Sequence, residues 1–129
     1  MRLYPPVGLL ARRVVAEDEL CGRRMQPNDI LFLPIWALHR HQLLWDRPDQ
    51  FLPERFDAAS PPKHKYQYLP FGAGPRVCVG ADFAMMQAQI ILATLLQQYR
   101  FQPSGPSPHP VMMMTVRPEP GVYLEINAA

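Results

Sequence analysis

The sequence predicts a mixed α+β chain with long irregular segments, and three observations lead to this class. Ala81 to Tyr99 contains no Gly or Pro and is rich in Ala, Leu, Met and Gln, so it is expected to be one long helix. Short β-branched apolar segments predict strands on either side of it. Proline makes up 16 of 129 residues, about 12% against an average of about 5%, while 48% of the residues are hydrophobic. Such a chain is ordered but irregular, and its length fits one domain or part of one.

The first third of the chain is expected to form a small sheet. Arg2 to Pro6 predicts the last turn of a helix, because its proline pair stops any helix that arrives from upstream. Val7 to Val15 is apolar and β-branched, Ile30 to Leu33 follows a Pro27-Asn28-Asp29 turn, and the two segments are predicted to pair as strands. Glu17 to Gly22 is expected to be a polar turn between them. Ile35 to His41 fits a short helix.

The remainder alternates between irregular segments and regular elements. Asp46 to Pro75 is expected to be an irregular meander, because its prolines are too closely spaced for a long element. After the long helix, Pro103 to Pro110 is a turn-rich connection, and Val111 to Val116 with Val122 to Ile126 is predicted to form a terminal β-hairpin. One face of the long helix is apolar, so the helix is expected to be buried on more than one side. The residues of that face are Ala84, Ala88, Ile91, Leu92 and Leu95.

Charge and hydropathy argue against several classes of partner. Lys and Arg number 13 against 11 Asp and Glu. Because the basic residues are spread along the chain, we expect neither a nucleic-acid partner nor an anionic lipid surface. The longest apolar stretch, Ile90 to Leu96, is far shorter than the roughly 18 residues needed to span a bilayer, and no signal segment opens the chain. The chain as written is therefore expected to be soluble. Its expected location is the cytoplasm, and the alternative is a longer protein with a membrane anchor upstream of Met1.

The segment that carries chemistry is a glycine-rich loop, Phe71 to Gly80, which delivers Cys78 just before the long helix. The two cysteines of the chain are too few for a disulfide framework and match no paired zinc spacing. The positive end of the helix dipole, its free N–H groups and the cation of Arg76 favour an anionic sulfur, which acts as a metal ligand or a nucleophile. Gly74 is expected to take a positive φ angle, and Gly80 to let a flat cofactor approach the backbone.

Three motifs, in the right order along the chain, resemble the cytochrome P450 family of haem-thiolate monooxygenases. The loop matches the family's pattern F-x-x-G-x-R-x-C-x-G at all five fixed positions. Arg2-Leu3-Tyr4-Pro5-Pro6 resembles the end of the family's E-x-x-R helix, and Pro53-Glu54-Arg55-Phe56 resembles its P-E-R-F meander. The resemblance implies that residues 1–129 are an incomplete domain, roughly the C-terminal haem-binding quarter to third of a mostly α-helical fold. The matching loop residues are Phe71, Gly74, Arg76, Cys78 and Gly80.

The resemblance implies a role for each loop residue. Cys78 is expected to be the axial thiolate ligand of haem b, a donor that favours cleavage of the O–O bond, with Phe71 packed beside the sulfur. Arg76 is expected to pair with a haem propionate. Arg12 resembles a second propionate contact, with Arg13 as the alternative. The cofactor-binding set also includes Gly72, Gly74 and Gly80.

The same resemblance implies a substrate cavity and partners. Val7, Leu9 and Met114 resemble positions that line the cavity for a small apolar organic substrate. Arg2 and Arg55 are expected to belong to a structural ion network beneath the haem. The implied reaction inserts one oxygen atom of O2 into the substrate, with electrons delivered by a ferredoxin or a flavin reductase.

The resemblance also has gaps, which leave a second hypothesis open. The glutamate three positions before Arg2 falls before Met1, and the family's long central helix is missing, so the chain resembles a fragment or a truncated product. The alternative function is therefore a non-catalytic remnant that binds haem weakly or not at all. The isolated chain is expected to be inactive and poorly soluble, because surfaces that the missing portion covers stay exposed.

Other chemistries fit the residues less well. Val77 stands where a dinucleotide-binding fingerprint needs glycine, and the serines lie in turn-like sequence, so no serine nucleophile elbow is present. A cysteine hydrolase based on Cys78 is a further alternative, although no histidine stands in a recognisable partner motif. Cys21 is expected to be an incidental thiol, and the histidines are expected to be surface or structural residues without a metal. The serines are Ser60, Ser104 and Ser107, and the histidines are His39, His41, His64 and His109.

Overall fold

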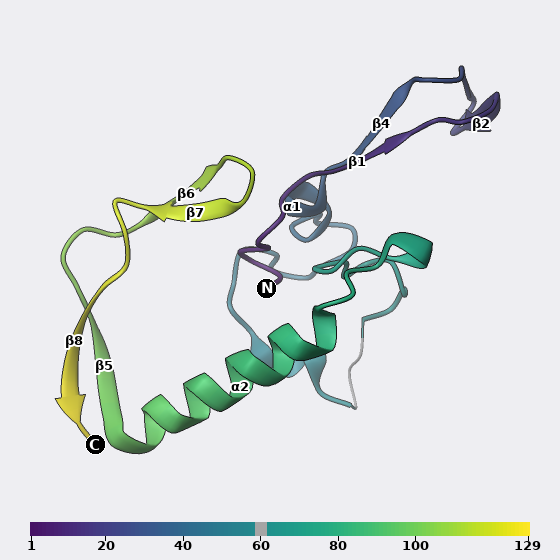
Figure 1. Cartoon of the computed structure of the whole chain (residues 1–129). Coiled ribbons are helices and arrows are strands. Elements are labelled where there is room, and N and C mark those ends of the chain that lie inside the picture. Colours follow the sequence, from purple (N-terminus) through teal and green to yellow (C-terminus); the bar gives the residue numbers. More distant parts are fainter. Residues whose placement is uncertain (59–61) are drawn as a thin grey trace. The chain divides into compact units, whose positions relative to one another are not determined.

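The chain forms two compact units, Met1–Pro70 and Phe71–Ala129, in a computed structural model that describes residues 1–58 and 62–129. Figure 1 labels the helices and strands. Within these described ranges, no helix is long and apolar enough to cross a membrane. Ser60, one of the serines considered as a nucleophile, lies outside the described residues.

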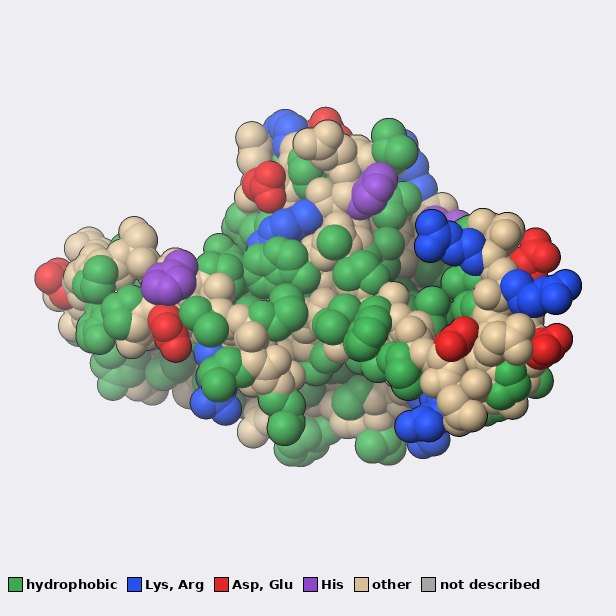
Figure 2. Space-filling view, turned by 90° about the horizontal axis from the view of Figure 1, so that it is seen from above, with side chains coloured by type: hydrophobic (Ala, Val, Ile, Leu, Met, Phe, Trp, Pro, Cys, Tyr) green, Lys and Arg blue, Asp and Glu red, His purple; other side chains and the backbone are tan. Residues whose placement is uncertain are grey.

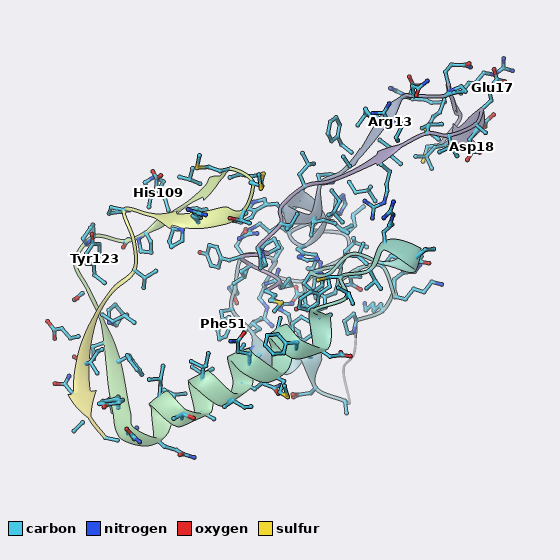
Figure 3. All side chains as sticks on the ribbon, viewed as in Figure 1. Arg13, Glu17, Asp18, Phe51, His109 and Tyr123 are labelled. Atoms are coloured by element: carbon cyan, nitrogen blue, oxygen red, sulfur yellow. The ribbon has the colours of Figure 1, made fainter. Side chains whose placement is uncertain are left out.

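The first unit begins with an antiparallel ladder of two strands. β1 (Leu10–Arg13) pairs with β4 (Ile30–Leu33), in a register that places Arg13 opposite Ile30. Figure 3 shows Arg13 on this ladder. Both predicted strands are confirmed, and the first is shorter than the apolar segment Val7 to Val15.

A second hairpin stands where a polar turn was expected over Glu17 to Gly22, so that prediction was wrong. β2 (Asp18–Leu20) pairs with β3 (Arg23–Met25), and an acidic residue of β2 lies opposite an arginine of β3. Cys21 and Gly22 connect the strands with φ angles of 53° and 76°, the two positive angles that a type I′ turn requires. Because the chain reverses within these two residues, the charged residues before them are free to pair as a strand, and opposite charges favour the pairing.

The core of the first unit surrounds a short helix. α1 (Ile35–Leu38) starts after Pro34 and confirms the short helix expected there. Ile35 and Trp45 are 1% and 4% exposed, and the Trp45 indole N–H donates to the carbonyl of Leu38 at 3.2 Å. The rings of Trp45 and Phe56 lie 6.2 Å apart, and those of Phe56 and Tyr68 lie 4.8 Å apart. The Trp45 hydrogen bond and the aromatic contacts therefore hold the irregular segments around Phe56 and Tyr68 against the end of α1.

The proline-rich segments are irregular, as predicted, with one difference at the start of the chain. Between Asp46 and Pro75 the described residues form only two short 3-10 helices, η1 (Pro53–Phe56) and η2 (Gly74–Arg76). The helix end expected at Arg2 to Pro6 is not found, because residues 1–9 form no helical turn. The proline pair in that segment has no N–H group to donate to a helical hydrogen bond.

The second unit joins one long helix to two hairpins. α2 (Ala81–Gln98) confirms the predicted helix and ends one residue earlier than expected. β5 (Tyr99–Ser104) continues directly from it and pairs with β8 (Tyr123–Ala128) at the end of the chain. Between them, β6 (His109–Met112) pairs with β7 (Val116–Glu119). Figure 1 shows the β6–β7 hairpin beyond the end of the β5–β8 pair.

The terminal hairpin predicted from Val111 to Ile126 was wrong in its pairing. Val111 and Val116 lie in two different strands, β6 and β7, which pair with each other. The last strand pairs instead with β5, with Phe101 opposite Ile126. Prolines within β5, β6 and β7 concealed these strands from the sequence analysis. They are tolerated because each sheet has only two strands, so every strand has a free edge where a missing N–H breaks no ladder bond.

The burial predicted for the long helix was also wrong, because α2 contains no buried residue. Ile91 and Leu92 are 51% and 57% exposed, and Figure 2 shows hydrophobic side chains over much of one face of the molecule. The spacing of apolar residues identified the apolar face correctly. Within the described residues nothing buries that face.

We expect this uncovered helix face to make the isolated chain self-associate, since large exposed apolar patches drive association. Replacing Ile91 and Leu95, which lie one turn apart, with glutamate is expected to shift the chain towards monomer in sedimentation velocity. The matched control is Val15→Glu, which places the same charge on an 89% exposed residue of the first unit. A wild-type chain that is monodisperse and melts cooperatively would contradict the expectation.

Candidate functional site

The glycine-rich loop closes on itself immediately before α2. The backbone N–H of Cys78 donates to the carbonyl of Phe71 at 2.9 Å, and the N–H of Val77 donates to the carbonyl of Gly74 at 3.0 Å. Gly72 and Gly74 have φ angles of 73° and 71°, a backbone conformation that residues with a side chain rarely adopt. The positive φ predicted for Gly74 is thus confirmed, and the glycines explain why the loop is tight enough to bring Cys78 back to its entrance.

The loop presents Cys78 at the start of the long helix. Gly80 is the N-cap of α2, and its carbonyl accepts from the N–H of Ala84 at 2.9 Å. The carbonyl of Cys78 accepts from the N–H of Ala81 at 3.3 Å. The Cys78 thiol is free and exposed. A sulfur in this position lies near the positive end of the helix dipole, which favours an anionic ligand or nucleophile.

The surroundings of the sulfur fit a flat cofactor bound through it. A Cβ added at Gly80 would meet the Cys78 Sγ at 3.9 Å and no other atom within 4 Å, so the backbone beside the sulfur is open. Arg76 is exposed at the end of η2, two residues before the cysteine. A soft donor atom, an open backbone face and a nearby cation are the features that a thiolate-bound haem with acidic side groups requires.

Arg2, in the first unit, is buried, with an exposed fraction of 5%. Its guanidinium donates to three backbone carbonyls, those of His39 and Gln50 at 2.8 Å each and that of Pro48. It also lies over the Trp45 ring at 5.1 Å from the centroid. Burial lowers the pKa of Arg2 from its ordinary value, and the charges of nearby arginines lower it further. An ion network was expected around Arg2, and the hydrogen-bond partners of its guanidinium are instead backbone carbonyls.

Arg55 and Arg40 are the arginines that act on Arg2. Arg55 donates to the carbonyl of Arg47 at 2.8 Å, while its Nε has no partner within the described residues. Arg40 forms an ion pair with Asp49 at 3.6 Å. Among the described residues, the cluster of Arg2, Arg40, Arg55 and Asp49 thus holds more cations than carboxylates.

The remaining predicted site residues are more exposed. Arg12 donates to the carbonyl of its neighbour Ala11 at 2.8 Å, while Arg13, on the opposite face of β1, donates to the Asn28 side chain at 3.3 Å. Val7 is half-buried and Leu9 is 44% exposed.

Met114 lies in the second unit, in the turn between β6 and β7, and is 94% exposed. The second unit thus contains the whole cysteine loop and Met114. The first unit contains Arg2, Arg12, Arg55, Val7 and Leu9.

The sequence analysis expected all four histidines to be surface or structural residues, and among them His39 is fully buried. The backbone N–H of His39 donates to the carbonyl of Ile35 at 2.9 Å. The spacing of four residues from Ile35 is the signal that could have placed His39 on the buried face of the first helical turn.

The loop and the helix that follows it define the class of the site, a glycine-rich loop that presents a free cysteine at the start of a helix. The sequence model of the cytochrome P450 family matches residues 1–126, and the chain belongs to this family. The P450 resemblance and the predicted mixed α and β fold class are both confirmed. Membership supports haem-thiolate monooxygenase chemistry at the level of the family.

The relatives are spread widely among organisms. Cytochrome P450 4d2 of Drosophila melanogaster is 37% identical over 98% of this chain and 25% of its own length. A cytokinin hydroxylase of Arabidopsis thaliana is 40% identical over 96% of this chain and 24% of its own length. The solved structure of retinoic acid bound cyanobacterial CYP120A1 matches with a TM-score of 0.91 and 26% identity, over 99% of this chain and 30% of that chain. The chain thus spans about a quarter of the length of these curated relatives.

Proposed function

We propose that this chain is the haem-ligand portion of a P450 monooxygenase, with Cys78 as the axial ligand of haem b. The observation that carries the proposal is the exposed Cys78 thiol on a closed loop at the start of α2, with an open backbone face at Gly80 beside the sulfur. When bound, the haem supplies the redox chemistry that inserts one oxygen atom of O2 into an apolar organic substrate.

The residues of this chain hold and tune that cofactor. Cys78 would hold the iron through an electron-donating thiolate, which would lie near the positive end of the α2 dipole. The exposed guanidinium of Arg76 would hold a propionate through charge-assisted hydrogen bonds, and the family resemblance implies Arg12 as a second propionate contact in the whole protein. Phe71 would pack beside the sulfur, and Gly80 would leave room for the ring. Support comes from the loop geometry and from the exposure of Arg76.

The whole protein supplies the remaining functions. In the whole protein, the family resemblance implies that Val7, Leu9 and Met114 belong to the wall of a cavity for a small apolar substrate, and that a ferredoxin or a flavin reductase delivers the electrons. We also propose that the activity is cytoplasmic, which family membership does not address.

A second candidate function is a non-catalytic remnant that binds haem weakly or not at all. It is favoured by the exposure of Cys78 and by the absence of any buried residue in α2. A ligand loop without a covered pocket exposes its iron site to water, and axial ligation by the thiolate is then weaker.

The absorption spectrum of the chain reconstituted with haem, reduced and exposed to carbon monoxide, separates the two candidates. We expect a red-shifted Soret band of the thiolate-ligated class, which Cys78→Ser abolishes completely. Cys21→Ser is the matched control, because Cys21 is also free and exposed but lies in the turn between β2 and β3. If wild type, Cys78→Ser and Cys21→Ser all gave the same spectrum of free or histidine-ligated haem, Cys78 would be rejected as the ligand. The non-catalytic remnant would then be the remaining hypothesis.

Two glycine substitutions separate folding of the loop from binding of the cofactor. Gly74→Ala is expected to destabilise the chain by about 1 kcal/mol, because alanine is strained at its positive φ. Gly80→Ala is expected to destabilise the free chain slightly, since its φ of −88° suits alanine but alanine is a poorer N-cap than glycine, and to weaken haem binding by about tenfold through its contact beside the sulfur. Denaturant titration and haem titration measure the two effects. The same haem affinity in Gly80→Ala and wild type would contradict the proposed position of the ring.

A further inference from the structure

His39 is the most deeply buried polar side chain among the described residues, with an exposed fraction of 0%. It follows α1 and faces the segment that leads into the cysteine loop. Its Nε2 accepts a hydrogen bond from the backbone N–H of Leu69 at 2.8 Å. Its ring lies against that of Tyr68, with centroids 5.3 Å apart. Leu69 stands two residues before Phe71, where the loop begins.

The hydrogen bond to Leu69 fixes the protonation of the imidazole. A backbone N–H can only donate, so the Nε2 of His39 must carry no proton. The proton of the neutral ring must then be on Nδ1, which is buried and has no partner within the described residues. An imidazolium would present an N–H at both nitrogens and would lose the Leu69 bond.

The charges around His39 also oppose an imidazolium. The facing charged groups are Arg2, whose Nη1 donates to the His39 carbonyl at 2.8 Å, the N-terminal amine, and Arg40. The phenol of Tyr68, whose own pKa is raised by burial, is neutral. Asp49 is paired with Arg40 and is itself well exposed. Burial lowers the pKa of His39 most, a hydrogen bond with the backbone of Arg2 opposes this, and the neighbouring cations lower the pKa further, to about 4.

We propose that His39 is a positioning residue whose neutral, Nδ1-protonated imidazole clamps the segment entering the Cys78 loop onto α1, and that acid releases this clamp. The clamp lies wholly within the first unit and does not rest on the proposed function, because it acts whether or not Cys78 binds a cofactor.

The ring nitrogens of the wild-type chain give the first test. In a long-range ¹H–¹⁵N spectrum at pH 7, His39 is expected to show an unprotonated Nε2 and a protonated Nδ1. Its titration midpoint is expected well below the ordinary histidine value of 6.5. The opposite tautomer, or a midpoint near 6.5 as an unfolded chain gives, would overturn the proposal.

Three variants test the clamp itself. His39→Gln keeps an acceptor for the Leu69 N–H and cannot titrate, so it is expected to retain slow amide exchange at Leu69. His39→Phe keeps a ring but has no acceptor, and is expected to lose that protection. His41→Asn is the control, because His41 is exposed and its Nδ1 accepts from the neighbouring Leu43 N–H. Unchanged protection of Leu69 in His39→Phe would reject the clamp, and a variant that fails to fold leaves the wild-type spectrum to decide.

The pH dependence of unfolding distinguishes the clamp from simple packing. The pKa of His39 is lower in the folded chain than in the unfolded one, so the unfolded chain binds the extra proton between about pH 6.5 and pH 4. Stability is therefore present above pH 6.5 and is lost on acidification through this window. The unfolding constant of wild type is expected to rise by about a hundredfold more than that of His39→Gln. An equal rise in both chains would contradict the proposal.

Discussion

Arg2→Ala is expected to unfold the first unit or to lower its free energy of unfolding by about 3 kcal/mol or more. The substitution removes three hydrogen bonds from a charged donor and leaves the carbonyls of His39, Pro48 and Gln50 without that partner. A buried acceptor left unpaired costs about 1–3 kcal/mol, and the contact over the Trp45 ring is lost as well. A domain is stable by only about 5–15 kcal/mol in total, so this single side chain decides whether residues 1–70 are folded.

Urea denaturation followed by Trp fluorescence measures this effect, because Trp45 lies beneath the Arg2 guanidinium. Arg2→Lys is expected to be intermediate, since an ammonium group cannot replace the planar fork that reaches three carbonyls. Arg13→Ala is the control, because the exposed Arg13 makes one side-chain hydrogen bond, of 3.3 Å. Equal midpoints for Arg2→Ala and Arg13→Ala would contradict the role assigned to Arg2.

The parts of the fold that were predictable from sequence are those set by local residues. The absence of Gly and Pro over 81–98 predicted α2, and the apolar run that starts at Ile30 predicted β4. The pairing of β5 with β8 was not predictable, because Phe101 and Ile126 are far apart in sequence and the connection between them contains another hairpin. The spacing of apolar residues likewise predicts which face of α2 is apolar. It does not predict whether another element covers that face.

The candidate site divides in the same way. The cysteine loop is a contiguous motif whose glycines and helix start act over a few residues, so its closed geometry followed from the sequence. The partners of Arg2 did not, since they lie 37 to 48 residues away and are backbone carbonyls, which any residue provides. The acceptor role of His39 also depends on a distant group, the Leu69 N–H.

Adding Glu-Ala before Met1 is expected to stabilise the chain by about 2 kcal/mol, because it places a carboxylate three positions before Arg2. Arg40 and Arg55 act on Arg2 as like charges, and Asp49 offsets them in part. A nearby anion relieves this repulsion and offers an acceptor to the unpartnered Nε of Arg55.

A Gln-Ala extension is the matched control, since it has the same length and an amide in place of the charge. The difference between the two extended chains is expected at pH 7 and lost as the carboxylate is protonated below about pH 4. Arg2→Ala in both extended chains should remove the difference, because the carboxylate then has lost its partner. Equal stability of the Glu-Ala and Gln-Ala chains at pH 7 would mean that carbonyls alone satisfy Arg2, and that the excess of cations in this cluster carries no cost.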